Sequence, residues 1–313
     1  MDKRIIFAGT PDFAAVHLKA LLDNGIRPVA VYTQPDRPAG RGHKLCPSDV
    51  KKVALEAGLT VYTPENFKDE KDILDFESLN ADLCIVVAYG VILPQRIIDA
   101  SKYGCINVHG SILPKYRGAA PIQRALLDGE SETGVSIMKV ELKLDAGEVY
   151  EIAKLPIENT DTSGTLFDKL AALGAQTLVG FLPKLFDSKV RATAQDESSV
   201  TYAKKISKDE AVMNFDQSAT DLDRTVRGLN PWPIATTTFD DVKYKVFQTI
   251  PCNEQSDKAP GTIVAVDKEG ITLACKKGCI KLVIIQAPGK GPVKAADLAR
   301  SRKEEFSVGK QFV

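Results

Sequence analysis

Short apolar runs alternate with helix-like stretches through the first half of the chain. The runs at 4–9, 29–33, 81–90 and 104–109 are almost continuously apolar, as is typical of strands buried on both faces. Between the first two, FAAVHLKALLDNG at 13–25 has the spacing of an amphipathic helix and ends on Asn-Gly, a helix stop signal. The alternation predicts an α/β protein with a doubly wound, mostly parallel sheet.

The pattern changes in the second half of the chain. A long helix-like run at 163–186 is followed by residues 188–209, which are polar and without a period. From 210 onwards, one helix-like stretch precedes short strand-like runs that are separated by turn signals. We therefore expect an α/β domain at 1–187, a linker at 188–209, and at 210–313 a small antiparallel barrel like the oligonucleotide-binding folds.

Composition narrows the function classes. The formal net charge of the 313 residues is zero, so binding to a polyanion would depend on local basic patches. No apolar run is long enough for a signal peptide or a membrane span, and the six cysteines form no CxxC pair. We expect a cytoplasmic protein without a membrane or metal site, and a monomer, since the barrel and linker show no self-complementary patch.

The strand-like run GCINVH ends in two polar residues, Asn107 and His109. Side chains alternate along a strand, so both face one side at its carboxyl end, where open α/β sheets bind ligands. Their neighbouring donors suit an oxygen that develops negative charge. Asp145, in KLDAGEV, is the candidate carboxylate that would favour the imidazolium and orient the ring. From spacing alone, all three residues could equally satisfy backbone groups or form a turn.

Other catalytic signatures are missing from the sequence. There is no GxSxG, no P-loop and no HExxH motif. The first strand leads into GTPDFA rather than GxGxxG, so an NAD site is poorly supported.

Five segments together resemble the folate-dependent formyltransferases. They are FAGTPDFA near the start, VVAYGVILP at 86–94, NVHGSILPKYRGAAP at 107–121, LDAGEV at 144–149 and TYAKKI at 201–206. The resemblance implies formyl transfer from 10-formyltetrahydrofolate, with Asn107, His109 and Asp145 as the catalytic residues. It also implies a folate pocket made largely of backbone, from Val86, Val87, Ala88, Tyr89, Gly90, Ile92, Ser111, Ile112, Leu113 and Pro114.

Two basic regions bear on the acceptor of the formyl group. The loop at 33–52 is similar to the insertion by which the tRNA-formylating members of this family enter the acceptor stem, although most charge runs are solvated loops. Between Lys276 and Lys303, eight basic residues face one acidic residue. We expect initiator methionyl-tRNA as the partner, bound through Arg37, Arg41, His43, Lys44, Lys115, Arg117, Lys281 and Lys290.

Several alternatives stay open at this point. Relatives with the same motif formylate small amines or amino sugar nucleotides, or hydrolyse formyl-folate, and the basic regions argue against these. Outside the formyl-transferring enzymes, two interpretations remain: a non-catalytic tRNA-binding protein and a nicotinamide oxidoreductase. Among other residues, we expect Trp232 to pack in the core, His17 to be structural, and the ring of Tyr89 to line the folate site.

Overall fold

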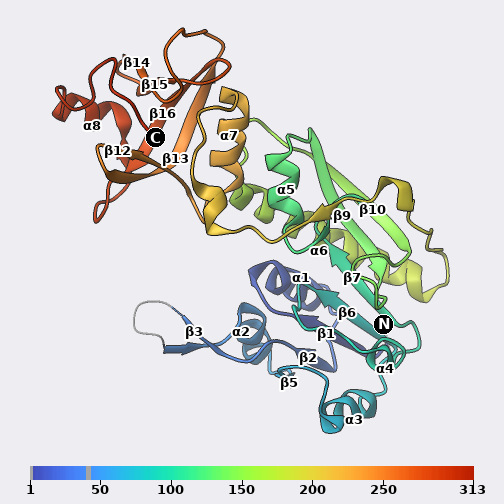
Figure 1. The fold of residues 1–313 in the computed structure, drawn as a ribbon. Helices are drawn as coiled ribbons and strands as arrows, with labels where there is room; N and C mark the ends of the chain where they lie inside the picture. The colour runs from blue at the N-terminus through green and yellow to red at the C-terminus, as the bar shows by residue number, and fades with distance from the viewer. Residues whose placement is uncertain (1–2, 40–43) are drawn as a thin grey trace. The chain divides into compact units, whose positions relative to one another are not determined.

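The computed structural model describes residues 3–39 and 44–313, and internal contacts divide the chain into two compact units (Figure 1). The first unit comprises the chain up to Pro121, Glu132–Pro156 and Phe167–Ala203. The second comprises Ile122–Ser131, Ile157–Leu166 and Lys204–Val313. Two short pieces of the predicted α/β domain thus belong to the second unit. No helix within the described ranges is long and apolar enough to span a membrane.

A seven-stranded sheet forms the centre of the first unit, in the order β10-β9-β7-β6-β1-β2-β5. Five strands run parallel: β1 (Ile5–Gly9), β2 (Ala30–Tyr32), β5 (Val61–Tyr62), β6 (Leu83–Val87) and β7 (Cys105–His109). The two strands at the other edge, β9 (Glu132–Lys139) and β10 (Val149–Pro156), are antiparallel to their neighbours. The predicted mostly parallel α/β fold is confirmed.

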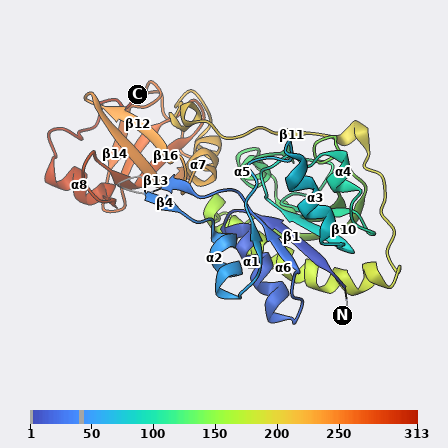
Figure 2. The ribbon, with the colours of Figure 1, turned by 90° about the horizontal axis from the view of Figure 1, so that it is seen from below.

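Helices cover both faces of this sheet (Figure 2). On one face lie α1 (Asp12–Asp23), which packs along α2 (Asp49–Glu56), and α6 (Ser163–Phe186). On the other lie α3 (Glu70–Ser78) and α4 (Gln95–Ile98), whose Phe76 and Ile97 share a core cluster with Ile6, Cys84 and Cys105. Strand alternation gives Asn107 and His109 the same orientation as Cys105, so both emerge on the α3/α4 face.

The segment expected as a linker contributes to the first unit. Its residues 188–203, which we call the strap, form a bridge between Thr193 and Val149. The strap also contains the short helix η1 (Glu197–Ser199) and the strand β11 (Tyr202–Ala203), which pairs in parallel with β8 (Arg117–Gly118). The strap therefore supports the loop that follows the Asn-x-His strand, which a free linker would not do.

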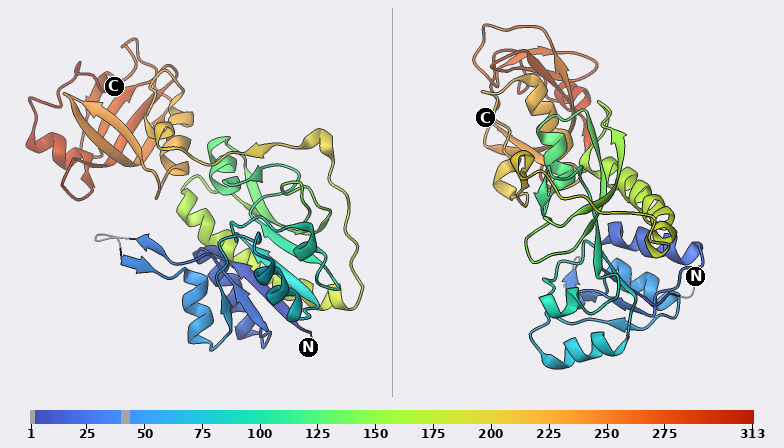
Figure 3. Two further views of the ribbon diagram at one scale, coloured as in Figure 1. Left: turned by 60° about the horizontal axis from the view of Figure 1, so that its bottom comes forward. Right: turned by 90° about the vertical axis from the view of Figure 1, so that its right-hand side faces the viewer.

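The second unit is built around an antiparallel sheet in the order β12-β13-β16-β15-β14 (Figure 3). Backbone hydrogen bonds join the last residues of the chain to both edge strands, at Thr238 and at Ile263, and so close the sheet into the predicted barrel. The rings of Phe239, Phe306 and Phe312 contact one another in its core, and Phe306 stacks on both of the others. The strands are β12 (Ala235–Phe239), β13 (Val242–Cys252), β14 (Ile263–Val266), β15 (Ile271–Ala274), β16 (Cys279–Gln286) and β17 (Val293–Lys294).

Shorter elements complete the two units. The first unit carries the hairpin of β3 (Arg37–Ala39) and β4 (Lys44–Cys46), within the basic loop of the sequence. The other helices are α5 (Pro121–Leu127), η2 (Lys208–Ala211), α7 (Ala219–Gly228) and α8 (Ala295–Ser301). Ser218 caps α7, its hydroxyl accepting a hydrogen bond from the backbone N–H of Asp221.

Candidate active site

The strand β7 brings Asn107 and His109 to one rim of the sheet. It lies between β6 and β9, and His109 is opposite Ser136 of β9. His109 is buried, whereas Asn107 is half-buried and its amide makes no hydrogen bond with any residue that the structure describes. An amide that is partly open to solvent and free of protein partners remains available for a ligand.

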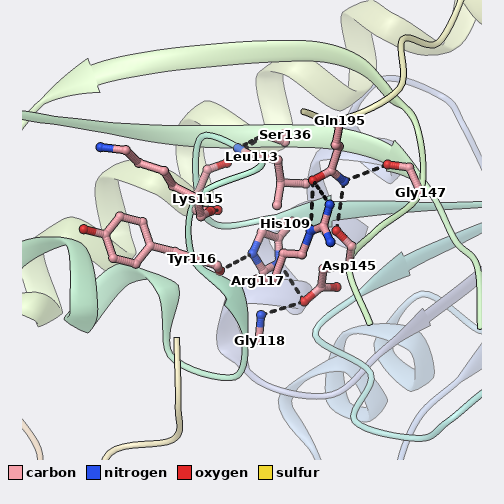
Figure 4. A network of polar contacts seen from close by, with 11 residues as sticks. His109, Leu113, Lys115, Tyr116, Arg117, Gly118, Ser136, Asp145, Gly147 and Gln195 are labelled. Atoms are coloured by element: carbon pink, nitrogen blue, oxygen red, sulfur yellow. Dashed lines mark hydrogen bonds and ion pairs between the residues drawn. The ribbon is translucent and has the colours of Figure 1, made fainter. Parts of the chain in front are cut away.

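The ring of His109 has two different neighbours (Figure 4). Its Nε2 lies 2.9 Å from the carbonyl oxygen of Tyr116. Because a carbonyl only accepts, Nε2 carries a proton and donates it to this bond. The other nitrogen, Nδ1, lies 3.8 Å from Oδ2 of Asp145. The structure thus brings His109 and Asp145 together, and Nδ1 is the nitrogen left for chemistry.

Asp145 is held by its backbone and its side chain. Its φ is +47°, in the left-handed region that Asp tolerates better than most residues. Its Oδ2 accepts a hydrogen bond of 2.8 Å from the backbone N–H of Gly118. The Asp145 carboxylate is therefore anchored on one side by the loop after β7 and faces His109 on the other.

The loop of residues 111–118 is fixed by several hydrogen bonds. The hydroxyl of Ser136 donates to the carbonyl of Ser111 and accepts from the N–H of Leu113. The hydroxyl of Ser111 donates to the carbonyl of Lys115, and Thr201 of the strap accepts from the N–H of Tyr116. Of the predicted folate residues here, Ser111 and Leu113 are buried, while Ile112 and Pro114 are half-buried.

The second predicted folate loop follows β6, with Val87 buried and Val86 half-buried. Ala88 has a φ of +45° and Gly90 one of +78°, and both are exposed. The carbonyl of Tyr89 between them accepts hydrogen bonds from Thr10 and Gln34. Ile92 is 90% exposed, which is unusual for so large an apolar side chain. The loop thus offers strained backbone and an apolar side chain beside the site.

The expectation that the ring of Tyr89 lines the folate site is wrong. The ring is buried in the core cluster on the α3/α4 face, beside Tyr32 and Cys84. Burial raises the pKa of the Tyr89 phenol. The left-handed turn at Ala88 reverses the alternation of the preceding strand, so the next side chain points inwards.

The predicted tRNA contact of Arg117 is also wrong. Its side chain is fully buried and donates to Oε1 of Gln195 and to Oε1 of Glu197, the latter at 2.8 Å. Hydrogen bonds from Arg117 and Lys143 lower the pKa of Glu197 to about 2. Arg117 joins the strap to the loop of residues 111–118, and its fully buried side chain cannot contact a nucleic acid.

The other predicted tRNA residues of the first unit have different outcomes. Arg37 and Lys44, on the hairpin, are exposed, and so is Lys115. Arg41 and His43 lie outside the described residues.

In the second unit, Lys290 is exposed, but Lys281 is not a free cation. The Lys281 ammonium lies 2.8 Å from carboxylate oxygens of both Asp267 and Glu269, and its side chain is only 12% exposed. The hydrogen bonds that the ammonium donates to these carboxylates raise the pKa of Lys281. The predicted tRNA contact of Lys281 is corrected accordingly, because its charge is compensated within the barrel.

Trp232 is not a core residue. It is 48% exposed, whereas Leu229 and Ile234 on either side of it are buried. These neighbours occupy the core positions, and the indole ring is left towards solvent.

The sequence alone did not predict the residues whose hydrogen bonds fix the loops around the candidate site. Gln195 of the strap donates hydrogen bonds to the carbonyls of Asp145 and Gly147, and Ser136 and Thr201 fix the loop after β7. Only the family-like TYAKKI segment, which contains Thr201, gave a signal. Gln195 lies in a polar stretch without a period and gave none.

An amide and an imidazole beside a carboxylate, at the rim of an α/β sheet, form a site of the group-transfer type. The chain belongs to the formyl transferase family. The family model described as Formyl transferase matches residues 3–182, and that of the Formyl transferase C-terminal domain matches residues 205–303. Among the described residues, no group of His, Cys, Asp and Glu side chains could hold a metal ion.

Solved structures with similar folds include two N-formyltransferases. WlaRD, a sugar 3N-formyl transferase in the presence of dTDP and 5-N-formyl-THF, has a TM-score of 0.67 and 18% identity, covering 93% of this chain and 100% of that one. The N-formyltransferase of Helicobacter canadensis, in complex with folinic acid and dTDP-3-aminofucose, has a TM-score of 0.65 and 18% identity over 91% of this chain and 99% of that one.

A third similar structure is HypX from Aquifex aeolicus in complex with tetrahydrofolic acid. Its TM-score is 0.62 and its identity 15%, covering 96% of this chain and 47% of that one. At such identities the likeness concerns the fold.

Proposed function

We propose that this enzyme transfers the formyl group of 10-formyltetrahydrofolate to the α-amino group of methionyl initiator tRNA, and that it acts as a cytoplasmic monomer. The observation that carries the chemistry is the approach of His109 Nδ1 to within 3.8 Å of Asp145 Oδ2, at the strand face that also carries Asn107. An amide, an imidazole and a carboxylate are the parts that acyl transfer needs.

The donors act on the oxygen of the formyl group. When the amine attacks the formyl carbon, the carbonyl electron pair moves to oxygen, and the amide of Asn107 would donate a hydrogen bond to it. His109 uses Nε2–H on the carbonyl of Tyr116, so Nδ1 must carry the second proton to donate as well. The imidazolium that results faces the Asp145 carboxylate, which would compensate its charge.

Proton transfer completes the reaction. The attacking amine must be neutral, and near pH 7.7–8.0, the ordinary pKa of an α-amino group, roughly half of it is. After attack the nitrogen carries a proton that must leave, and the Asp145 carboxylate would accept it, directly or through water. The bond between the formyl carbon and N10 then breaks, and N10 takes a proton in return.

The loops around the site suit a folate co-substrate, which supplies the activated formyl group. Exposed backbone at Ala88 and Gly90 can pair with the amide-like edge of a pterin ring, as the resemblance implies. The apolar side chains of Ile92, Leu142 and Leu144 are all largely exposed on the two loops that flank the site. Apolar side chains left in solvent beside polar catalytic groups are typical of ligand sites.

Exposed basic side chains bear on which molecule accepts the formyl group. Arg37 and Lys44 are exposed on the β3–β4 hairpin, Lys115 follows the catalytic strand, and Lys290 is exposed on the barrel. Exposed cations of this kind favour a phosphate backbone. The second candidate is an amino sugar nucleotide, which is favoured by the similar sugar 3N-formyl transferase WlaRD and by the N-formyltransferase in complex with dTDP-3-aminofucose.

One comparison tests both candidates. Formyl transfer from 10-formyltetrahydrofolate is measured with methionyl initiator tRNA, a methionyl elongator tRNA, free methionine and a dTDP-amino sugar. We expect transfer to the charged initiator tRNA. Transfer to the amino sugar alone would establish the second candidate and refute the first.

A further inference from the structure

Gln195, in the strap, uses its whole side-chain amide on the two loops that carry the catalytic groups (Figure 4). Its Nε2 donates to the carbonyls of Asp145 and Gly147, at 2.9 and 2.7 Å. Its Oε1 accepts from Nε and Nη2 of Arg117, at 3.1 and 2.9 Å. We propose that Gln195 is a positioning residue that sets the Asp145 carboxylate against His109, and this inference rests on the proposed function.

The turn that carries Asp145 needs such support. A left-handed φ at Asp145 is stable only when the surroundings hold it. On one side the turn presses on β9, since a Cβ at Gly147 would lie 2.0 Å from the carbonyl oxygen of Lys139. On the other side, the carbonyls of Asp145 and Gly147 both point to Gln195 Nε2. Gln195 thereby fixes two peptide planes of the turn.

Arg117 determines which way the Gln195 amide points. The two Arg117 atoms that contact Gln195 are both N–H donors, so only the acceptor Oε1 can pair with them. The other amide atom, Nε2, then points to the turn. Arg117 is fully buried, and its neighbour Gly118 donates to Oδ2 of Asp145. The loop after β7 therefore holds Asp145 twice, directly through Gly118 and indirectly through Arg117 and Gln195.

Two substitutions separate positioning from simple packing. Gln195→Glu keeps an acceptor for Arg117 but loses the two donors to the turn, and Gln195→Met keeps the volume but loses both functions. We expect kcat to fall by about 10- to 100-fold in both, as for a misplacement of about 1 Å. KM for charged tRNA, the affinity for 5-formyltetrahydrofolate and Tm should change little. Ser198→Ala, on the exposed part of the strap, is the matched control and should keep the wild-type kcat.

A double-mutant cycle shows whether Gln195 acts through Asp145. In an Asp145→Asn background, Gln195→Glu should have little further effect on kcat, because the group that it positions is already lost. Multiplicative losses would overturn the proposal, and so would a wild-type kcat or a loss of kcat that follows a loss of Tm.

A readout without turnover separates this proposal from the proposed function. The amide proton resonance of Gly118 reports its hydrogen bond to Asp145 in the free enzyme. We expect it to shift in Gln195→Glu and in Asp145→Asn but not in Ser198→Ala. If wild-type enzyme formylates no tRNA and these shifts occur, the acceptor is wrong and the positioning stands. An unshifted Gly118 resonance in Gln195→Glu would refute the positioning whatever the acceptor.

Discussion

Two buried histidines of the first unit lie in opposite surroundings. Each donates one ring N–H to a backbone carbonyl: His17 Nδ1 to Phe13 at 2.7 Å, and His109 Nε2 to Tyr116 at 2.9 Å. They differ at the second nitrogen. Nε2 of His17 is buried without a partner among the described residues, whereas Nδ1 of His109 faces the Asp145 carboxylate. Burial and one hydrogen bond are therefore common to both rings, and only the surroundings of the second nitrogen distinguish them.

The pKa of His17 shows the effect of burial without a charged partner. Desolvation lowers the pKa of His17 to about 4, although its hydrogen bond to Phe13 acts in the opposite direction. Such a ring is neutral at pH 7 and cannot stabilise an oxyanion as a cation. Its Nε2 lies against Gly174 of α6, which agrees with the prediction that His17 is structural.

The largest expected effect separates the two histidines by activity. In the proposed mechanism, His109→Ala removes a donor to the developing oxyanion, so kcat should fall by about 10²- to 10³-fold, or roughly 3–4 kcal/mol of barrier. Affinity for 5-formyltetrahydrofolate, measured by calorimetry, should change far less. His17→Asn is the comparator and should keep kcat at pH 7.5. A wild-type kcat in His109→Ala would remove His109 from the mechanism.

The next prediction separates them by stability. The pKa of His17 is about 4 in the folded chain and 6.5 in the unfolded chain, so the unfolded state binds more protons below pH 6.5. The free energy of unfolding should therefore decrease as pH falls from 6.5 towards 4, by about 2 kcal/mol at pH 5 from this residue alone. Denaturant titrations at pH 7.5 and pH 5 measure this decrease.

In His17→Asn, the decrease between the two pH values should be smaller by that amount. The comparison uses differences between pH values, so a constant cost of the substitution cancels. Equal decreases in both proteins would show that His17 does not titrate in this range.

The parts of the candidate site that depend only on neighbouring residues could be predicted from the sequence. A strand of five residues and its alternation place Asn107 and His109 on one face, whatever the rest of the chain does. The left-handed turn at Ala88 is also local, but Ala carries no sign of it, and the ring of Tyr89 was placed on the wrong side as a result.

Contacts across long sequence distances could not be predicted. Gln195 reaches a turn 50 residues earlier, and Arg117 reaches Glu197 80 residues later. A polar stretch without a period has the same composition whether it is solvated or holds an active site. Lys281 and Lys290 cannot be told apart in the sequence either, because only the fold brings Asp267 and Glu269 to Lys281.

Buried and exposed cations of the first unit should differ in tRNA binding. Arg117 is buried and donates hydrogen bonds to Gln195 and Glu197, whereas Arg37 and Lys44 are exposed on the hairpin. The double variant Arg37→Ala/Lys44→Ala should raise KM for charged tRNA by about tenfold, with a salt dependence flatter by roughly 0.7–0.9 per lost phosphate contact. Folate affinity and kcat should stay unchanged. A rise in KM without any change in the salt dependence would show that the hairpin does not contact phosphates.

The smallest effect distinguishes the two barrel lysines. Lys290→Ala removes an exposed cation, so KM for charged tRNA should rise by a few-fold and its salt dependence should flatten by about one contact's share. Lys281→Ala removes a cation already compensated by two carboxylates. It should lower Tm slightly, because ion pairs whose carboxylates stay open to solvent contribute about 0–1 kcal/mol each, and it should leave the salt dependence of KM unchanged. If Lys281→Ala flattened the salt dependence as Lys290→Ala does, the tRNA would compete with Asp267 and Glu269 for this ammonium. In that case, an ion pair within the barrel would not show that a lysine is excluded from tRNA binding.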